Sequence, residues 1–266
     1  METSNNRVLR YLRQLNTGLR GSIPLKDAFN ELPLRSELYS ADQMEQRGKH
    51  LAAIHKLTQD RPRNHLMTRL AENEAVLIDV CERLTTALKT NQQITPASEW
   101  LLDNFYLIEE QIRTARHHMP KGYSRELPCL LNGPSIGLPR VYDIVLEIIS
   151  HGDGQVDSES LGRFVASYQT VSVLKLGELW AIPIMLRLAL IENLRRVAIR
   201  IAADRIDYDL ANAWAKRMVT VAETDPKSLV LEIADMARLQ PPMSTPFVSE
   251  FKRQLQGHGL ASSLPL

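Results

Sequence analysis

One segment constrains the fold of this chain more than any other. Between about Leu176 and Arg205, apolar side chains recur with the period of one long α-helix. The first half of this segment is apolar almost all round, so we expect neighbouring helices to enclose it, with Trp180 inside. Pro183 removes a backbone hydrogen bond and is expected to kink the helix or split its first turn. The stripe that we expect to face the core consists of Leu179, Ile182, Leu186, Leu190, Leu194, Val197 and Ile201.

Helix start signals recur along the rest of the chain. Ser40 and Gln43 form a capping box ahead of a helix expected to run to about Leu57. The helix that begins at Pro96 is expected to continue to near Pro120. Gly152 is expected to close the preceding helix in the left-handed conformation. The residues predicted to cap or open helices are Ser40, Asn64, Thr95, Pro139, Asp157, Asp207, Asp225 and Thr245, and Pro96, Pro226 and Pro246 each suit a first helical position.

These patterns predict an all-α fold. No segment shows sustained apolar–polar alternation between turn signals, so we expect few or no strands. The predicted architecture is a multi-helix bundle of stacked, mostly antiparallel helices around a kinked and buried central helix. We expect helical parts over 1–120 and 139–266 joined by a Gly/Pro-rich connection over 121–138, or one continuous domain. The chain ends on Leu264-Pro265-Leu266 without a terminating signal, which is typical of a truncated C-terminus.

Composition excludes several classes of protein. The chain has 32 basic and 31 acidic side chains, a balance that argues against nucleic-acid binding. Cys81 and Cys129 lie far apart and form no metal-binding or redox motif, and two lone thiols suit a reducing cytosol. The N-terminus lacks the apolar region of a secretory signal. The most apolar stretch, Leu179 to Ile191, contains Arg187 and is shorter than the roughly 20 residues that a membrane span needs.

Short motifs offer weak candidates for metal sites. Asp207-Tyr208-Asp209 matches the Asp-x-Asp pattern by which many glycosyltransferases hold a metal, but its place between two helical segments favours helix capping by Asp207. The segment from Gly152 to Asp157 resembles a calcium loop but lacks the required ligands at positions 3 and 12, so a turn is favoured. His117-His118 and the His50/His55 pair lack the i, i+4 spacing of helical metal ligands, so we expect solvated histidines at helix ends. We therefore predict no metal and no cofactor.

Catalytic motifs are equally weak. Glu109, Glu110 and Glu178 resemble candidate acid/base carboxylates, but adjacent glutamates on a helix point apart and more often form a solvated face. Trp100, Trp180 and Trp214 are candidates for stacking on sugar rings, whereas packing in the core is the commoner use of tryptophan. The chain contains no nucleophile elbow and no glycine loop that cradles phosphate, so we predict no catalytic residue.

Several longer segments carry a family resemblance. The most specific is Leu176-Gly177-Glu178-Leu179-Trp180-Ala181-Ile182-Pro183-Ile184-Met185-Leu186-Arg187-Leu188, continued by Ile191-Glu192-Asn193-Leu194-Arg195-Arg196. Further matching segments are Glu99 to Phe105 with Ile108 to Gln111, Gly122-Tyr123 with Arg125 to Pro128, and Pro139 to Tyr142; 35–40 and Phe247 to Leu255 agree more loosely. In these segments the chain resembles the N-terminal region of the bacterial cyclic β-1,2-glucan synthases, which are large membrane-bound glucosyltransferases.

The resemblance implies a function for the whole polypeptide rather than for this segment. Synthases of this family polymerise glucose from UDP-glucose, trim the chain with a phosphorylase-like module and close it by transglycosylation. The resemblance thus implies a non-catalytic helical module at the inner face of the bacterial inner membrane, on the cytoplasmic side. Its partners would be the remaining modules of the same polypeptide, and it would meet UDP-glucose and glucan only through them.

Two alternatives from other classes stay open. A stand-alone helical adaptor would expose a contiguous apolar patch. A saccharide-binding protein would bring a tryptophan face and two carboxylates together in a pocket. In Glu178 and Arg187 the predicted central helix carries charges whose unpaired burial would be unfavourable, so an internal ion pair is favoured over an external contact. The candidate interaction or core-network residues are Gly122, Tyr123, Arg125, Glu126, Glu178, Trp180, Arg187, Glu192 and Arg195.

Overall fold

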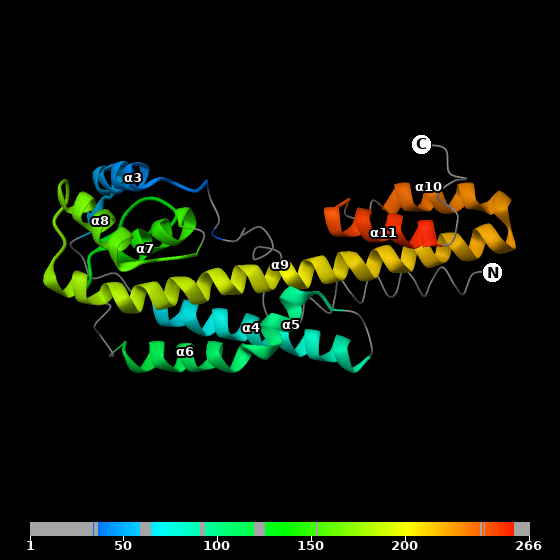
Figure 1. Cartoon of the computed structure of the whole chain (residues 1–266), viewed down its shortest axis with the longest axis horizontal. Helices are drawn as coiled ribbons and strands as arrows, with labels where there is room; N and C mark the ends of the chain where they lie inside the picture. Colours follow the sequence, from blue (N-terminus) through cyan, green and yellow to red (C-terminus); the bar gives the residue numbers. More distant parts are fainter. Residues whose placement is uncertain are drawn as a thin grey trace. The chain divides into compact units, whose positions relative to one another are not determined.

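The computed structural model describes residue 34, residues 37–58, 65–90, 94–119, 126–152, 154–239, residue 241 and residues 243–257. These residues fold almost entirely into helices, which confirms the predicted all-α bundle (Figure 1). In chain order the elements are α3 (Ala41–Ile54), β1 (Leu57–Thr58), α4 (Leu66–Lys89), α5 (Pro96–Asp103), α6 (Phe105–His117), β2 (Cys129–Leu130), α7 (Arg140–His151), α8 (Ser158–Gln169), α9 (Leu176–Thr224), η2 (Pro226–Ser228), α10 (Leu229–Leu239) and α11 (Thr245–Gly257).

Side-chain caps start several of these helices as predicted. Ser40 and Gln43 form both hydrogen bonds of the capping box, although α3 ends at Ile54 rather than near Leu57. The Thr95 hydroxyl accepts from the N–H of Ser98, and the Asp157 carboxylate accepts two N–H groups of α8. Each cap satisfies backbone donors that have no partner inside the helix. The predicted cap Asn64 lies outside the described residues, and the helix that follows it, α4, ends at Lys89.

Other predicted boundaries are wrong. The helix expected from Pro96 to near Pro120 is divided at Asn104, whose amide donates to the carbonyl oxygen of Trp100 and so competes with the backbone ladder. At the start of α11 the N–H of Phe247 is accepted by the Ser244 hydroxyl, so the cap is one residue earlier than Thr245. By contrast, Asp225 is the N-cap of a helix that begins at Pro226, as predicted, but this helix is a short 3-10 turn and the Asp225 side chain makes no bond to its backbone.

The end of α7 also differs from the prediction. Gly152 has φ −102°, so it is not left-handed, and a Cβ there would meet the carbonyl oxygen of Gln155 at 2.6 Å. Gly154 is the residue with positive φ, at 76°. The tight turn after α7 therefore needs glycine at both positions, for space at the first and for conformation at the second.

Two described strands of two residues each join the end of α3 to the segment before α7. β1 and β2 pair antiparallel, with Leu57 opposite Leu130 and Thr58 opposite Cys129. The side chain of Asn132 extends this pairing, since it accepts from the N–H of Lys56 and donates to the carbonyl oxygen of Ile54.

The described residues divide into two compact units, a larger one within Asn30–Ile199 and a smaller one within Arg200–Leu266. Helix α9 contributes residues to both. In the larger unit α3 packs on α7 and α8, and α4 packs on α5 and α6 (Figure 1). Of the predicted connection over 121–138, the described residues 126–138 lie within the larger unit, and the predicted domain limits stay a prediction.

Helix α9 buries a different face from the predicted one. Of the expected stripe only Ile182 is buried, whereas Leu190 is exposed. The residues of α9 that the larger unit buries are Glu178, Ala181, Ile182, Ile184, Met185, Leu188, Ala189, Ile191, Glu192, Arg195, Ala198 and Ile199. Because about 100° separates successive helical residues, Trp180 lies opposite Glu178 and is 71% exposed. The expectation that Trp180 is sheltered is wrong, because the face of α9 that packs inward is the one that carries the buried Glu178 and Glu192. Pro183 lies inside the helix without splitting it.

The smaller unit has a core of its own. Trp214 lies at its centre and is 1% exposed, with Leu210, Met218, Phe247 and Leu255 buried in the same cluster. Asp207 does not cap a new helix, because α9 continues through it to Thr224. Its carboxylate instead accepts from the Ser244 hydroxyl at 2.5 Å, and this contact ties the start of α11 to α9.

Candidate functional site

The first charged cluster in the larger unit joins α7 to the start of α9. Arg140 donates from Nε and Nη2 to the two carboxylate oxygens of Glu178, at 2.6 and 2.7 Å. The same guanidinium donates to the hydroxyl of Ser172 and the carbonyl oxygen of Val173, both at 2.8 Å. Glu178 also accepts the N–H of Lys175 at 2.9 Å. Burial alone would lower the pKa of Arg140, but the Glu178 carboxylate outweighs it and the pKa is raised. The Glu178 carboxylate is therefore held by donors from a guanidinium and from the backbone.

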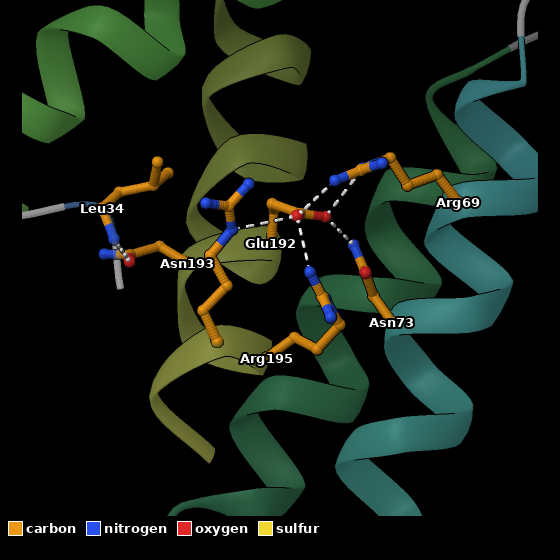
Figure 2. Close-up of polar contacts among 7 residues, drawn as sticks. Leu34, Arg69, Asn73, Glu192, Asn193 and Arg195 are labelled. Carbon is orange, nitrogen blue, oxygen red and sulfur yellow. Dashed lines mark hydrogen bonds and ion pairs between the residues drawn. The ribbon is translucent and has the colours of Figure 1, made fainter. Parts of the chain in front are cut away.

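The second cluster centres on Glu192, which is completely buried (Figure 2). Arg69 of α4 donates to both carboxylate oxygens, at 3.0 and 2.6 Å, and Asn73 donates at 2.9 Å. From α9 itself, Arg195 donates at 2.9 Å and Arg196 at 3.2 Å. Burial would raise the pKa of Glu192, but Arg69 and Arg195 outweigh it and lower the pKa to about 2. One carboxylate thus fastens α4 to α9.

A neighbouring contact attaches a segment far away in sequence. The N–H of Leu34 donates to the side-chain oxygen of Asn193 at 2.8 Å, next to the Glu192 cluster (Figure 2). This part of α9 therefore holds partners from two regions of the chain, α4 and the segment that contains Leu34.

A third cluster lies between α3, α7 and α8. The ring of His55 is 2.8 Å from the Tyr168 hydroxyl through Nδ1 and 3.1 Å from an Asp143 oxygen through Nε2. Tyr168 is fully buried, and burial raises the pKa of its hydroxyl. The guanidinium of Arg140 lies 5.9 Å from the centre of the Tyr168 ring. This network therefore adjoins the Arg140–Glu178 pair.

The structure brings some of the predicted site residues together. Glu192 pairs with Arg195 and Arg196, three and four residues further along α9, and the Glu192 carboxylate in these pairs is fully buried. Glu178 is ion-paired inside the molecule, with Arg140 rather than with Arg187. Arg187 lies on another face of α9 and donates to Gln111 of α6 at 2.9 Å.

The remaining predicted positions that the structure describes are exposed. Glu126 is exposed, whereas Gly122, Tyr123 and Arg125 lie outside the described residues. Trp180 is on the outward face of α9. The interaction role of the predicted set stays a prediction.

Sequence reasoning missed the partners that complete these clusters, Arg69, Asn73 and Arg140. Each lies 38 or more residues from the glutamate that it binds. The only sequence signal is indirect, because two glutamates in so apolar a helix require cationic partners from elsewhere in the chain. The prediction that His55 is solvated is wrong, since its side chain is only 5% exposed.

The metal and catalytic candidates are not assembled into sites. Among the described residues, no group of three or more His, Cys, Asp and Glu side chains is arranged to hold a metal ion. Asp209 pairs with Arg205 one turn away, and Glu109 and Glu110 are exposed on α6. In the same part of the chain, no helix is long and apolar enough to cross a membrane. Of the three tryptophans only Trp214 is in a core, since Trp100 is 57% exposed.

Comparison with known proteins adds one relationship. No family model matches the chain. It is 36% identical over 157 residues to the cyclic beta-(1,2)-glucan synthase NdvB of Rhizobium meliloti (strain 1021). That match covers 59% of this chain but only 6% of the synthase, so the chain spans a small part of the length of its relative. The chain is therefore related to one segment of an NdvB-like cyclic β-(1,2)-glucan synthase, which confirms the resemblance that its sequence indicates.

Proposed function

We propose that this chain is a non-catalytic helical module of a cyclic β-1,2-glucan synthase, which supports glucosyl transfer from UDP-glucose by other modules of the same polypeptide. The observation that carries the proposal is the state of the two carboxylates that are most deeply buried among the described residues. Glu178 and Glu192 are 1% and 0% exposed, and arginines engage both.

Such carboxylates suit a structural role. A general acid or base must exchange a proton with a substrate, and its pKa is commonly shifted toward the working pH. Glu192 has the opposite property, with a pKa of about 2 and donors from Arg69, Asn73, Arg195 and Arg196. Glu178 likewise accepts from Arg140 and from the backbone of Lys175. Their bonds hold α4 and α7 on α9.

The outward face of α9 supports a role in docking. Leu176 and Trp180 are 61% and 71% exposed, Pro183 follows on the same face, and Val173 just before the helix is 75% exposed. We call these four residues the Trp180 face. Residues spaced by 4 and 3 share one side of a helix, so this apolar surface is continuous along α9. Exposed apolar surfaces of this kind mark interaction sites.

We assign the Trp180 face to another part of the same synthase polypeptide. The relative is far longer than the matched segment, and all but 6% of it lies outside that segment. A partner within the polypeptide is present at high effective concentration, so a small apolar contact is enough for stable docking. A lipid surface is less favoured because binding to a membrane surface usually adds a cluster of lysines and arginines to the apolar face. Lys175 is the lone lysine between Val173 and Pro183, and the nearby Arg187 binds Gln111.

The test of docking is Trp180→Asp in the complete synthase that contains this chain. We expect a several-fold fall in glucan synthesis by the membrane fraction, because a charge at the contact opposes burial. The matched control is Trp100→Asp, since Trp100 is also exposed, at 57%, but belongs to α5. Equal activity of the two variants would contradict docking through α9. Concentration-dependent dimers of the isolated chain that Trp180→Asp abolishes would instead assign the face to a second copy.

Calorimetric titration of the purified chain with linear β-1,2-glucan and with UDP-glucose tests the non-catalytic assignment. We expect no heat of binding and no release of UDP. Binding or turnover of either compound would overturn the assignment. The exposed indole of Trp180 is the observation that favours a saccharide-binding function, because aromatic rings stack on sugars. Loss of glucan binding in Trp180→Ala would establish that alternative.

The location of the module in the cell separates it from a stand-alone adaptor. We infer that the module lies on the cytoplasmic side of the bacterial inner membrane with the rest of the synthase. Fractionation of cells that produce the complete polypeptide tests this location. Recovery of the chain as a separate soluble product would favour a stand-alone helical adaptor instead.

A further inference from the structure

The C-terminal residue of α7, His151, holds the segment that leads into α3. Its Nδ1 lies 2.7 Å from the carbonyl oxygen of Glu37, and its Nε2 lies 3.0 Å from Oε1 of Glu147. The ring of Tyr39 stacks on the imidazole with centroids 3.8 Å apart and planes inclined by 8°. The N–H of Tyr39 also points at the carbonyl oxygen of His151, at 3.4 Å. Residues 37–39 are thus attached to the end of α7 chiefly through one side chain.

Both ring nitrogens of His151 face atoms that only accept hydrogen bonds. A backbone carbonyl has no proton to donate, and the Glu147 oxygen that faces the ring already accepts from the guanidinium of Arg47 of α3. A neutral imidazole carries one N–H and can form only one of the two bonds. The other nitrogen would then direct its lone pair at an oxygen. With the side chain only 9% exposed, water has little room to relieve that contact.

We propose that His151 is a proton-operated latch: its imidazolium form fastens residues 37–39 to α7, and loss of the proton releases them. The attached state binds one proton more than the released state. Attachment is therefore favoured as pH falls and weakened as pH rises. This inference does not depend on the proposed function.

The surrounding charges set the strength of the latch. Glu147 of α7 attracts the imidazolium, and the last carbonyl groups of α7 add a favourable helix dipole. Arg47 of α3 opposes it, because it shares the same Glu147 oxygen. Tyr39 contributes its ring face, and Asp143 of α7 adds negative charge near Arg47. Two carboxylates and one guanidinium therefore surround the site.

His55 provides an internal contrast. One of its partners is the Tyr168 hydroxyl, which can donate to Nδ1, while Nε2–H donates to Asp143. A neutral His55 satisfies both bonds, so no additional proton is required there. Among these two buried histidines, only His151 demands the charged form.

The test combines imidazole NMR with a spin label on the released segment. Glu37→Cys places a label at an exposed residue. The substitution keeps the contact with His151, because that contact uses the backbone carbonyl oxygen of residue 37 and not the carboxylate. The native Cys81 and Cys129 are buried, so labelling is selective. Nitrogen chemical shifts should show His151 with both N–H groups at the acidic end of a pH series and with one at the alkaline end. Over the same range the mobile fraction of the label should rise about tenfold, the effect of losing one charge-assisted hydrogen bond.

Two variants make the outcome decisive. In His151→Gln the label should show no pH-dependent change of mobility, because glutamine does not titrate. In Glu147→Gln the ring loses its carboxylate partner, and release should move to lower pH. A label whose mobility is constant in the native chain, or that changes equally in His151→Gln, would overturn the latch. So would a His151 ring with a single N–H throughout the range.

Discussion

Arg140 and Glu178 meet inside the larger unit in a two-pronged ion pair, and their side chains are 3% and 1% exposed. Because Arg140 is the first residue of α7 and Glu178 lies in the first turn of α9, this contact fixes the beginnings of two helices together. Each charge is stable in the interior only while the other is present.

The first prediction is that removing one member of this pair destabilises the larger unit strongly. Arg140→Met should lower the free energy of unfolding by about 3–5 kcal/mol, since it leaves a buried carboxylate without its cation. Urea denaturation followed by circular dichroism measures the change. The double variant Arg140→Met with Glu178→Leu should recover at least about 2 kcal/mol, because no unpaired charge remains. No recovery in the double variant would show that the pair matters for reasons other than charge.

The second prediction concerns acid. Because the pKa of Glu192 is about 2 in the folded chain and ordinarily 4.5, the folded state favours the carboxylate form. The resulting stabilisation is fully present above about pH 4.5 and is lost as pH falls toward about 2, a change on the order of 3 kcal/mol. Unfolding free energies measured across this range test the expectation. The matched variant Glu192→Gln should be less stable at neutral pH and should lack this part of the acid dependence.

The third prediction contrasts two tryptophans of α9. Trp214→Ala should destabilise the smaller unit by about 3–5 kcal/mol, because it empties the centre of a core. Trp180→Ala should change stability by no more than about 0.5 kcal/mol, because that side chain is mostly in water. Thermal unfolding of both variants measures the two changes in stability. Similar losses of stability would mean that Trp180 is covered in solution.

The fourth prediction concerns two helical glycines. Gly48 of α3 is buried against α8, where a Cβ would collide with the Ser167 hydroxyl and lie 3.0 Å from the carbonyl oxygen of Phe164. Gly48→Ala should therefore destabilise the chain by about 1–3 kcal/mol. At Gly162 of α8 a Cβ would meet no described neighbour within 4 Å, so Gly162→Ala should instead stabilise the chain by about 0.5–1 kcal/mol. Chemical denaturation of the two variants should give opposite signs.

Local signals in the sequence predicted local structure well. Ser40, Thr95 and Asp157 each bond backbone groups two or three residues away, so the whole interaction is contained in a short stretch of chain. The all-α class followed from many such stretches. Asn104 shows the limit, because an asparagine is compatible both with a helix interior and with the side-chain bond that ends α5.

The inward face of α9 was not predictable by the same means. An apolar stripe indicates the core-facing side of a helix when hydrophobic burial is the main contribution to its packing. Here hydrogen bonds to partners on α4 and α7 bury Glu178 and Glu192 instead. Those partners lie far away in sequence, so the choice of face depends on tertiary contacts. The exposure of Trp180 follows from that choice, as does the correction at Asp207, where contacts with Ser244 accompany an unbroken helix.

The two buried thiols give the larger unit a chemical reporter of its own opening. Cys81 and Cys129 are the two cysteines of the chain, and both lie within Asn30–Ile199. Burial raises the pKa of both thiols, that of Cys81 to about 11, so the reactive thiolate is scarce near neutral pH. The rate of thiol alkylation, measured by mass spectrometry on samples quenched at successive times, would therefore report how often the larger unit opens. The smaller unit contains no cysteine and does not contribute to this signal.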